Sequence, residues 1–439
     1  MFYAKDILSF QETCEIDRSL WGCSCFYQEK CYIHCMKNVI ILGSGIQGIC
    51  AAFALNKKGY SVTVVEKESS VINKTSKNQE GRVHLGFTYA LDKSGMTGNI
   101  VLNNSLHFSL LLEEWLGKIQ WAKYLMPKGY YLVHKDSLLT ESELIDYYEK
   151  LDKTYLNFLK RDSKLSYFGK RPETLFKVLK DIPNSMSRCK ISAVIKTEER
   201  IVEMFYLRDL ILDSLKKTTI KIMTDTEVQQ VIREDKGFTI IAKSKNNEEV
   251  RLKSDIVANC LWNNRILIDK TLGITTLKDP LYRFKCGILG TVDRPVPTCS
   301  IVTGVFGNIS PRLDHRHAYI SWHSECMQGI TTDGTTPAKW EDSFNENLTT
   351  DLNSSWIKNT ISNLSEFVPS LKTFKPIKLL PGIICSAGKT DIGDKDSKVH
   401  SRGSHIGVHS FDGYFSVDTG KFCSAPFFAN ELVKKVEEL

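Results

Sequence analysis

The chain has 439 residues, of which 42% are apolar and 25% charged, an ordinary composition for a globular protein that is too long for one simple core. The net charge of +7 is modest, and its lysines and arginines are spread along the chain, which argues against a dedicated nucleic-acid surface. No run of 18 apolar residues occurs, so we expect no membrane span.

The 13 cysteines are odd in number and stand mostly in apolar contexts. Because the sequence shows no signal peptide, this usage favours reduced thiols in a cytoplasmic protein over a disulfide framework.

Residues 1–36 form a cysteine-rich leader without clear hydrophobic periodicity. Its possible metal ligands are Cys14, Cys23, Cys25, His34, Cys31 and Cys35. No CxxC pair is present and the spacing matches no zinc pattern, so we expect no metal site and a poorly ordered segment. Met36 directly precedes the first predicted strand, and we expect the residues before it to be dispensable.

Residues 37–67 carry the most informative pattern, a complete nucleotide-binding βαβ unit. The apolar run 38–42 predicts a buried parallel strand, and 61–65 predicts a second one. Between them lies a helix with basic residues in its last turn and a glycine after it, a common C-terminal cap. Glu66 follows the second strand about 20 residues after the first glycine, where a ribose-binding carboxylate is expected.

The turn from strand to helix reads Gly43-Ser44-Gly45-Ile46-Gln47-Gly48. In such a fingerprint the first glycine permits the tight turn, the second leaves room for a pyrophosphate, and the third lets the helix approach the strand. Free N–H groups at the start of the helix would bind the phosphates. The sequence therefore predicts a dinucleotide site.

The rest of the chain alternates between helical and β-rich segments. Strands are predicted over 128–134, 219–223, 227–232, 237–242 and 254–260, with a β-rich stretch from 282 to 322. Helices are predicted over 106–116, 141–159, the later part of 197–215, much of 340–367, and about 425–436. Residues 227–242 read as a hairpin, and 403–420 as a glycine-rich region. No internal repeat is visible.

Four blocks resemble the glutathione-reductase-like flavoproteins of the D-amino-acid-oxidase group, which includes glycine and sarcosine oxidases, 2-hydroxyglutarate dehydrogenase and flavin-dependent glycerol-3-phosphate dehydrogenases. The blocks are the βαβ unit ending at 64–67, the segment 76–86, the pair 226–228 and 255–260, and the segment 418–429. Together they span Lys37 to Val436. The third block departs from the family pattern, since Asn259-Cys260-Leu261-Trp262 stands where small residues with glycine are usual.

The resemblance implies an α/β fold, with a Rossmann-type FAD-binding domain and an inserted, mostly antiparallel β substrate domain. It implies a discontinuous FAD-binding domain over 37–120, 190–280 and 381–439, and a substrate or cap domain over 121–189 and 281–380. The residues expected to bind FAD are Gly43, Gly45, Ile46, Gln47, Gly48, Glu66, Lys67, Ser76, Asn78, Gln79, Val228, Gly420 and Lys421.

Only one dinucleotide fingerprint is present, whereas relatives that use NAD(P)H directly commonly carry two. We therefore expect the substrate to reduce FAD, and oxygen or another acceptor to reoxidise it. The first hypothesis is oxidation of a CH–NH group in a small anionic amino acid or amine. The alternatives are a dehydrogenase of a hydroxy acid or polyol phosphate, favoured by Gly420-Lys421, and a non-catalytic flavin-binding scaffold or redox sensor.

A substrate carboxylate would need a fixed cation, ideally an arginine. Arg283 lies between apolar neighbours and is the first candidate, with Arg312 and Arg402 as rivals. Lys421 would stabilise negative charge on the reduced flavin or on the substrate.

A hydroxyl substrate would also need a base, for which His84 and His323 are candidates. Cys385 sits where some amine oxidases of the group attach flavin covalently, but we expect an ordinary packed cysteine there.

Overall fold

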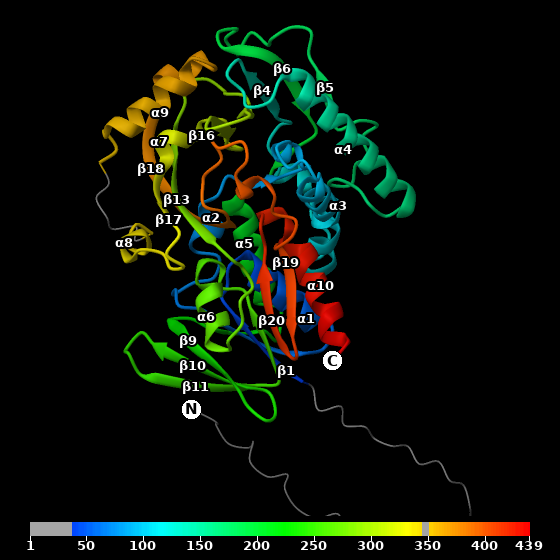
Figure 1. The fold of residues 1–439 in the computed structure, drawn as a ribbon, viewed down its shortest axis with the longest axis vertical. Coiled ribbons are helices and arrows are strands. Elements are labelled where there is room, and N and C mark those ends of the chain that lie inside the picture. The colour runs from blue at the N-terminus through cyan, green and yellow to red at the C-terminus, as the bar shows by residue number, and fades with distance from the viewer. Residues whose placement is uncertain (1–36, 345–350) are drawn as a thin grey trace, which may run out of the picture. The chain divides into compact units, whose positions relative to one another are not determined.

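Within residues 37–344 and 351–439, which the computed structural model describes, six strands form the sheet that carries the βαβ unit (Figure 1). Their order is β19 (Gly407–Phe411), β20 (Tyr414–Asp418), β12 (Ile256–Asn259), β1 (Asn38–Leu42), β2 (Ser61–Val65) and β8 (Lys221–Met223). All neighbours are parallel except β19 and β20. The predictions for the leader lie outside the described residues.

The strand β1 is buried on both faces because its side chains alternate between two apolar cores. Val39 and Ile41 pack with α1 (Ile46–Lys57), α3 (Met96–Leu116) and α10 (Ala425–Glu437). Ile40 and Leu42 pack on the other face, against α6 (Arg265–Thr271) and a three-stranded sheet. This sheet consists of β9 (Thr226–Arg233), β10 (Phe238–Ser244) and β11 (Glu249–Ser254). The predicted hairpin is confirmed by the antiparallel pairing of β9 with β10.

A second, nine-stranded sheet contains most of the remaining strands. Its order is β17 (Met327–Thr331), β13 (Pro280–Thr291), β16 (His317–Trp322), β15 (Gly307–Pro311), β14 (Cys299–Val302), β4 (Tyr130–His134), β6 (Ile191–Thr197) and β5 (Phe176–Val178), with β18 (Lys375–Ala387) paired to β13. Only β14 and β4 pair in parallel. A separate apolar core joins this sheet to α9 (Ser355–Ser365).

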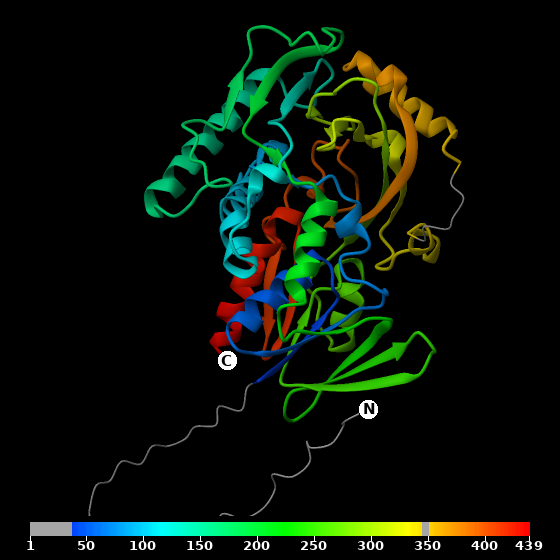
Figure 2. The same cartoon turned by 180° about the vertical axis from the view of Figure 1, so that it is seen from behind.

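Short elements and two further helices connect the sheets. They are α2 (Thr75–Asn78), β3 (Arg82–Val83), α4 (Glu141–Arg161), β7 (Arg200–Ile201), α5 (Met204–Leu215), α7 (His323–Cys326) and α8 (Ala338–Asp342). Turns of 3-10 helix lie at Phe87–Tyr89, Trp121–Lys123, Trp262–Asn264, Pro369–Thr373, Lys398–His400 and Phe422–Ser424. Figure 2 shows α5 and α1 from behind, both near the parallel sheet.

The fold class predicted from the sequence is confirmed, since a parallel sheet flanked by helices is combined with a mostly antiparallel sheet. Two strands pair across the domain limits predicted from the sequence. The strand β6 falls inside the range predicted for the FAD-binding domain, yet it pairs with β4 and β5. Strand β18 likewise runs across the predicted limit at residue 381.

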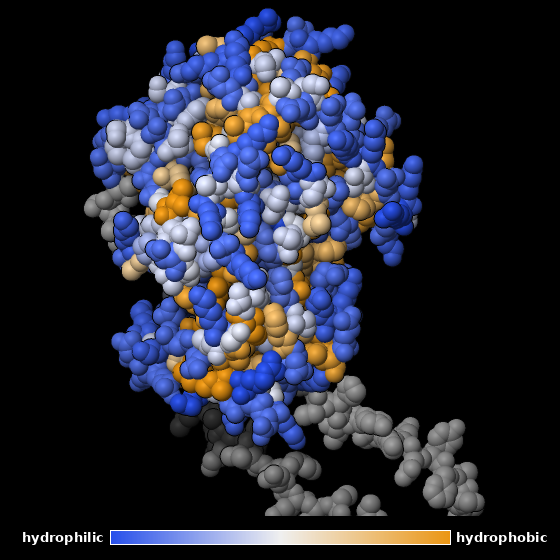
Figure 3. All heavy atoms as spheres, in the orientation of Figure 1, coloured by the Kyte–Doolittle hydropathy of each residue, from blue (hydrophilic) through white to orange (hydrophobic). Residues whose placement is uncertain are grey.

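The surface is mostly polar. In the face shown in Figure 3, hydrophilic side chains dominate and hydrophobic ones form separate groups between them. None of the helices in the described ranges combines the length and apolar character that a membrane span requires.

Candidate functional site

One cavity extends from the glycine turn after β1 to residues of β13. Its volume of about 510 Å³ is within the usual range for ligand sites, about 300–1,000 Å³. Its lining includes all four predicted catalytic residues, His84, Arg283, His323 and Lys421. It also includes every predicted FAD-binding residue except Gly48. The structure thus brings together side chains that are far apart in the sequence.

The glycine turn has the geometry that a dinucleotide requires. Gly43 adopts φ +90°, a conformation that L side chains rarely take. A Cβ at Gly48 would lie 1.9 Å from the Gly43 carbonyl oxygen, so this glycine allows the close approach of α1 without reaching the cavity. A Cβ at Gly45 would meet only the Ser76 hydroxyl, at 3.3 Å, which leaves the cavity side of the turn open.

The carboxylate of Glu66 lines the cavity at the end of β2. One oxygen accepts hydrogen bonds from the Ser44 amide (2.7 Å) and hydroxyl (2.6 Å), and the other accepts one from the Glu68 amide (2.9 Å). Two carboxylate oxygens offer about four acceptor sites, and three are used, so one remains for a ribose hydroxyl.

The side chain of Gln47 provides a further test of whether the site fits a dinucleotide. Thr419 donates to the side-chain oxygen of Gln47 (3.1 Å), but the amide nitrogen of Gln47 is buried with no hydrogen-bond partner. Such orphaned donors are rare in native proteins unless a ligand or water completes them. The glycine turn, Glu66 and Gln47 together fit a bound dinucleotide.

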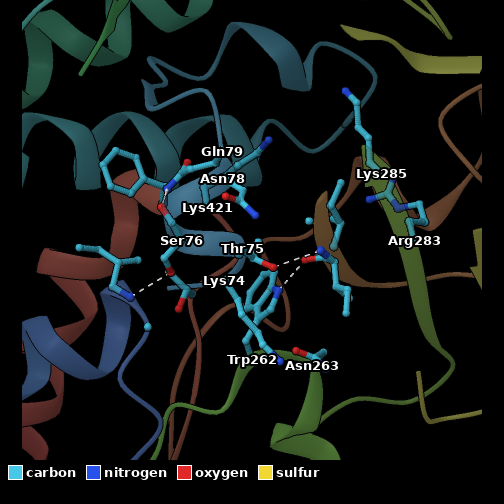
Figure 4. Close-up of a pocket in the computed structure, with 18 of the residues that line it drawn as sticks. Lys74, Thr75, Ser76, Asn78, Gln79, Trp262, Asn263, Arg283, Lys285 and Lys421 are labelled. Carbon is cyan, nitrogen blue, oxygen red and sulfur yellow. Dashed lines mark hydrogen bonds between the residues drawn. The ribbon is translucent and has the colours of Figure 1, made fainter. Parts of the chain in front are cut away.

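The segment around α2 links β18 of the nine-stranded sheet to the first turn of α1. Thr75 accepts a hydrogen bond from the Ile383 amide (3.1 Å), and Asn78 donates to the Pro381 carbonyl (3.0 Å), so both hold β18. At the other end, the Ile46 amide donates to the Ser76 hydroxyl (3.1 Å), as the dashed line in Figure 4 marks.

An ionic cluster lines the nucleotide end of the cavity, which is the end that carries the glycine turn and Glu66. Glu341 of α8 pairs with Lys67 (2.8 Å) and Lys74 (2.5 Å), and Lys74 also pairs with Glu68 (2.7 Å). Burial alone would raise the pKa of Glu341, but the two ammonium groups outweigh it and lower this pKa to about 2. The carboxylate is therefore ionised at neutral pH.

Arg82 of β3 belongs to a buried network of ion pairs and hydrogen bonds. Its Nε donates to Glu80 (3.0 Å), and its Nη1 lies 3.6 Å from Glu199. Glu199 also accepts from the Leu85 amide (2.7 Å) and the Tyr131 hydroxyl (2.8 Å). Burial opposes ionisation of Glu80, yet Arg82 lowers its pKa to about 2, so both carboxylates are charged.

His84 lies next to this network. Its Nδ1 is buried, makes no hydrogen bond, and lies 3.7 Å from a Glu199 oxygen. Burial, reinforced by the charge of Lys421, lowers the pKa of His84, so the imidazole is neutral near pH 7 and able to accept a proton.

A second buried group joins β13 to the loop after β18. Asp391 accepts a hydrogen bond from Arg283 Nη1 (2.8 Å) and contacts Nε2 of His323 (2.7 Å). Burial lowers the pKa of His323 despite this carboxylate, so His323 is also neutral. Arg283, the first candidate for binding a substrate carboxylate, already has an anionic partner. Asp391 was not predicted, because it stands in a polar loop without any motif.

Three cations that line the cavity have no carboxylate partner among the residues that the structure describes. They are Lys285, Arg402 and Lys421. The Arg402 side chain is buried and, among the described residues, donates only to the carbonyls of Val399 (3.1 Å) and Gly420 (3.4 Å). In Figure 4, Arg283 and Lys285 extend from β13, and Lys421 is labelled on the opposite side of the view.

Lys421 lies in an unfavourable environment for its charge. Burial and the nearby Arg402 lower its pKa to about 8. Its ammonium lies 5.7 Å from the ring centre of Tyr89, whose hydroxyl is buried without a hydrogen-bond partner.

Two other residues considered from the sequence lie outside the cavity lining. Arg312 pairs with Glu203 at 3.0 Å. Cys385 is packed in an apolar cluster, where burial raises its pKa to about 12. This is the ordinary packed cysteine that we expected.

Comparisons with known proteins agree with this geometry. The family model DAO, described as FAD dependent oxidoreductase, matches residues 38–401. Among solved structures, the chain is similar to glycine oxidase from Geobacillus kaustophilus (14% identity, 92% of this chain and 95% of the other, TM-score 0.64). It is similar to L-proline dehydrogenase from P. horikoshii (16%, 91% and 94%, 0.61) and to L-alpha-glycerophosphate oxidase from Mycoplasma pneumoniae (16%, 92% and 95%, 0.59). At these identities the structural likeness establishes the fold alone.

Proposed function

This chain belongs to the DAO family of FAD-dependent oxidoreductases, and from that premise we propose that it oxidises the CH–NH group of a small, anionic amino acid or amine. The observation that carries the proposal is the cavity itself. One end carries the glycine turn and Glu66, and the other carries cations that pair with no carboxylate in residues 37–344 and 351–439. Glycine oxidase and L-proline dehydrogenase, two proteins of similar fold, are named for amino-acid substrates, which supports the CH–NH assignment.

The residues of the βαβ unit would hold the cofactor. Gly45, Ile46 and Gln47 would face the pyrophosphate, Glu66 the ribose, and the backbone at Val228 the adenine. Gly420 and Lys421 would lie near the flavin ring. When bound, FAD supplies the hydride acceptor.

The substrate would be oriented through its carboxylate. Arg402 is better suited to this role than Arg283, because Asp391 already neutralises Arg283. A terminal nitrogen of Arg402, Nη2, makes no hydrogen bond to the described residues, and the unpartnered hydroxyl of Tyr89 is a second donor. Arg283 would then position Asp391 and, through it, His323.

Oxidation of a CH–OH group is the second candidate function, and the two histidines favour it. Removal of a hydride from an alcohol requires that its hydroxyl proton be taken up. His84 and His323 are both neutral and both line the cavity, so either could take it up. L-alpha-glycerophosphate oxidase, a protein of similar fold, is named for such a substrate.

Anaerobic mixing of the purified protein with amino acids, amines and hydroxy acids tests the proposal. We expect an amino acid or amine to bleach the flavin absorbance. Bleaching by hydroxy acids or polyol phosphates alone would favour the second candidate, and bleaching by no compound would favour a scaffold or redox sensor. Oxygen consumption with peroxide release would separate an oxidase from a dehydrogenase that uses another acceptor.

A further inference from the structure

A second cavity lies beside the C-terminal half of α3, and no described residue lines both cavities. Its walls come from α3, from the segments 118–125 and 166–172, and from Glu198 and Arg200. Its volume of about 470 Å³ is within the range of small-molecule sites, about 300–1,000 Å³. The proposed oxidation uses none of these residues.

Aromatic side chains form part of the apolar wall of this second cavity. The rings of Trp121 and Phe168 have centres 4.9 Å apart and planes inclined by 66°. The indole nitrogen of Trp121 donates to Glu113 (2.7 Å), which holds the ring in place. Such rings favour a planar aromatic ligand, which adds further edge-to-face contacts. The other apolar lining residues are Leu110, Ile119, Ala122, Leu125 and Pro172.

Two serines of the lining have unused hydroxyls. Ser109 is 3% exposed and Ser166 is 8% exposed, and both line the second cavity. Each hydroxyl is accessible but makes no hydrogen bond with any described residue. Since polar groups of buried residues are normally paired, a ligand or water is expected to complete them.

Arg200 supplies a cation with unused donors. Its Nε donates to the Met126 carbonyl (2.8 Å), which anchors the guanidinium. Nη1 and Nη2 donate to no residue within the described ranges. Burial lowers the pKa of Arg200, but a guanidinium stays charged at neutral pH. A bound anion would therefore stabilise this partly desolvated charge.

The two acidic residues of the lining do not neutralise Arg200. Glu198 forms an ion pair with Lys128, and Glu113 accepts the indole hydrogen bond. Neither is paired with the Arg200 guanidinium in the part of the chain that the structure describes. The remaining charged lining residues are the exposed Lys118 and Lys170.

Direct contacts join the arginine to the aromatic wall. The backbone amide of Arg200 donates to the Tyr167 hydroxyl (2.8 Å), and the Tyr167 ring centre lies 4.9 Å from that of Phe168. Phe168 in turn contacts Trp121. The cation and the rings therefore border one cavity as parts of a single packed cluster.

We propose that this cavity is a second ligand site, which binds a small aromatic carboxylate with its anionic group at Arg200 and its ring against Trp121 and Phe168. The two terminal nitrogens of an arginine match the geometry of a carboxylate. The hydroxyls of Ser109 and Ser166 provide further hydrogen bonds. The site is separate from the FAD cavity and does not depend on the reaction proposed there.

Calorimetric titration of the FAD-loaded protein with three probes tests the proposal. Indole-3-acetate carries both a ring and a carboxylate, indole-3-acetamide lacks the charge, and acetate lacks the ring. We expect indole-3-acetate to bind with a dissociation constant lower by about tenfold or more than that of either other probe.

Variants locate the bound probe. Arg200→Met should weaken indole-3-acetate binding by about tenfold or more, because the charged donors are lost. Ser109→Leu should weaken it similarly by filling the cavity, and it removes no hydrogen bond to a described residue. Arg171→Met is the matched control, because Arg171 is an exposed arginine of the same segment outside the lining. Arg402→Met alters the FAD cavity, and both of these variants should bind indole-3-acetate like the unmodified protein.

Thermal unfolding of each variant is measured first, so that lost binding is compared only among folded proteins. Equal affinities for indole-3-acetate and indole-3-acetamide, or unchanged affinity in both Arg200→Met and Ser109→Leu, would overturn the proposal. Loss of binding in Arg402→Met with retention in Arg200→Met would place the probe in the FAD cavity and would also overturn it.

Discussion

Glu66 is the single residue on which FAD binding should depend most directly. We expect Glu66→Ala to weaken FAD binding by about 1–3 kcal/mol, because charge-assisted hydrogen bonds to the ribose would be lost. Titration of apoprotein with FAD, followed by flavin fluorescence, measures the change. Glu249→Ala removes an exposed carboxylate from β11 and serves as the control. An unchanged dissociation constant in Glu66→Ala would contradict the assignment of the motif.

The lowered pKa of Lys421 predicts a pH dependence of anion binding. Below about pH 8 the ammonium is charged and attracts an anion, and above this pH it becomes neutral. We therefore expect the affinity for carboxylate ligands to fall as the pH rises through about 8. Lys421→Met should have lower affinity at pH 7 and a flatter profile between pH 7 and 9. The same slope in both proteins would show that another group titrates.

The residues of the site differ in how well the sequence reveals them. The glycines and Glu66 were predictable because a dinucleotide imposes fixed spacing on one short segment. Asp391 and the availability of Arg402 were not, since both depend on which side chains from distant segments meet in the cavity. Arg283 shows the difference clearly, because its apolar neighbours made it the first candidate for a substrate carboxylate but could not indicate that Asp391 would neutralise it.

At the scale of elements, helix α8 is joined to the nucleotide end of the cavity by Glu341, which pairs with Lys67 and Lys74. We expect Glu341→Gln to increase the rate of FAD dissociation several-fold, because its ion pairs with Lys67 and Lys74 would be lost. Displacement of bound FAD, followed by fluorescence at low and high salt, measures the rate. The effect should shrink at high salt, which screens such pairs.

Asp342→Asn is the matched control for this prediction, because Asp342 is the next residue of the same helix and is not part of the cavity lining. Equal dissociation rates in the two variants would mean that Glu341 does not hold the cofactor.

The strands that the sequence did not predict have identifiable causes. Strand β18 contains Pro376, Pro381 and Gly382, which normally interrupt a strand. It tolerates them because β13 is the one strand that pairs with it among the described residues, so amides that face away from β13 are not needed for a ladder. Strands β19 and β20 are joined by Asp412-Gly413, both with positive φ, which is a hairpin signal that the glycine-rich reading of 403–420 overlooked.

At the scale of the whole molecule, a single dinucleotide unit limits the possible reductants. We expect neither NADH nor NADPH to reduce the flavin at a meaningful rate, because only one GxGxxG fingerprint occurs and it serves FAD. Anaerobic stopped-flow mixing tests this expectation, with dithionite as the positive control for a reducible flavin. Rapid bleaching by either nicotinamide would contradict this expectation.

The overall architecture could be predicted because local patterns and the family resemblance agreed. The βαβ unit, the hairpin of β9 and β10, and the C-terminal helix were all visible in short windows of sequence. The pairing of β6 with β4, by contrast, joins segments separated by a long helix, and no local pattern specifies such a partner.

The order in which the parallel sheet is assembled has a consequence for synthesis of the chain. The strand β1, made first, lies between β2 and β12, and β12 pairs with β20 near the end of the chain. The helix α10, made last, covers α1 and α3 through apolar residues that include Leu432 and Val436. A nascent chain therefore exposes this apolar surface to solvent until α10 has been synthesised and has packed against α1 and α3. Premature termination should produce aggregation and proteolysis rather than a partly active enzyme.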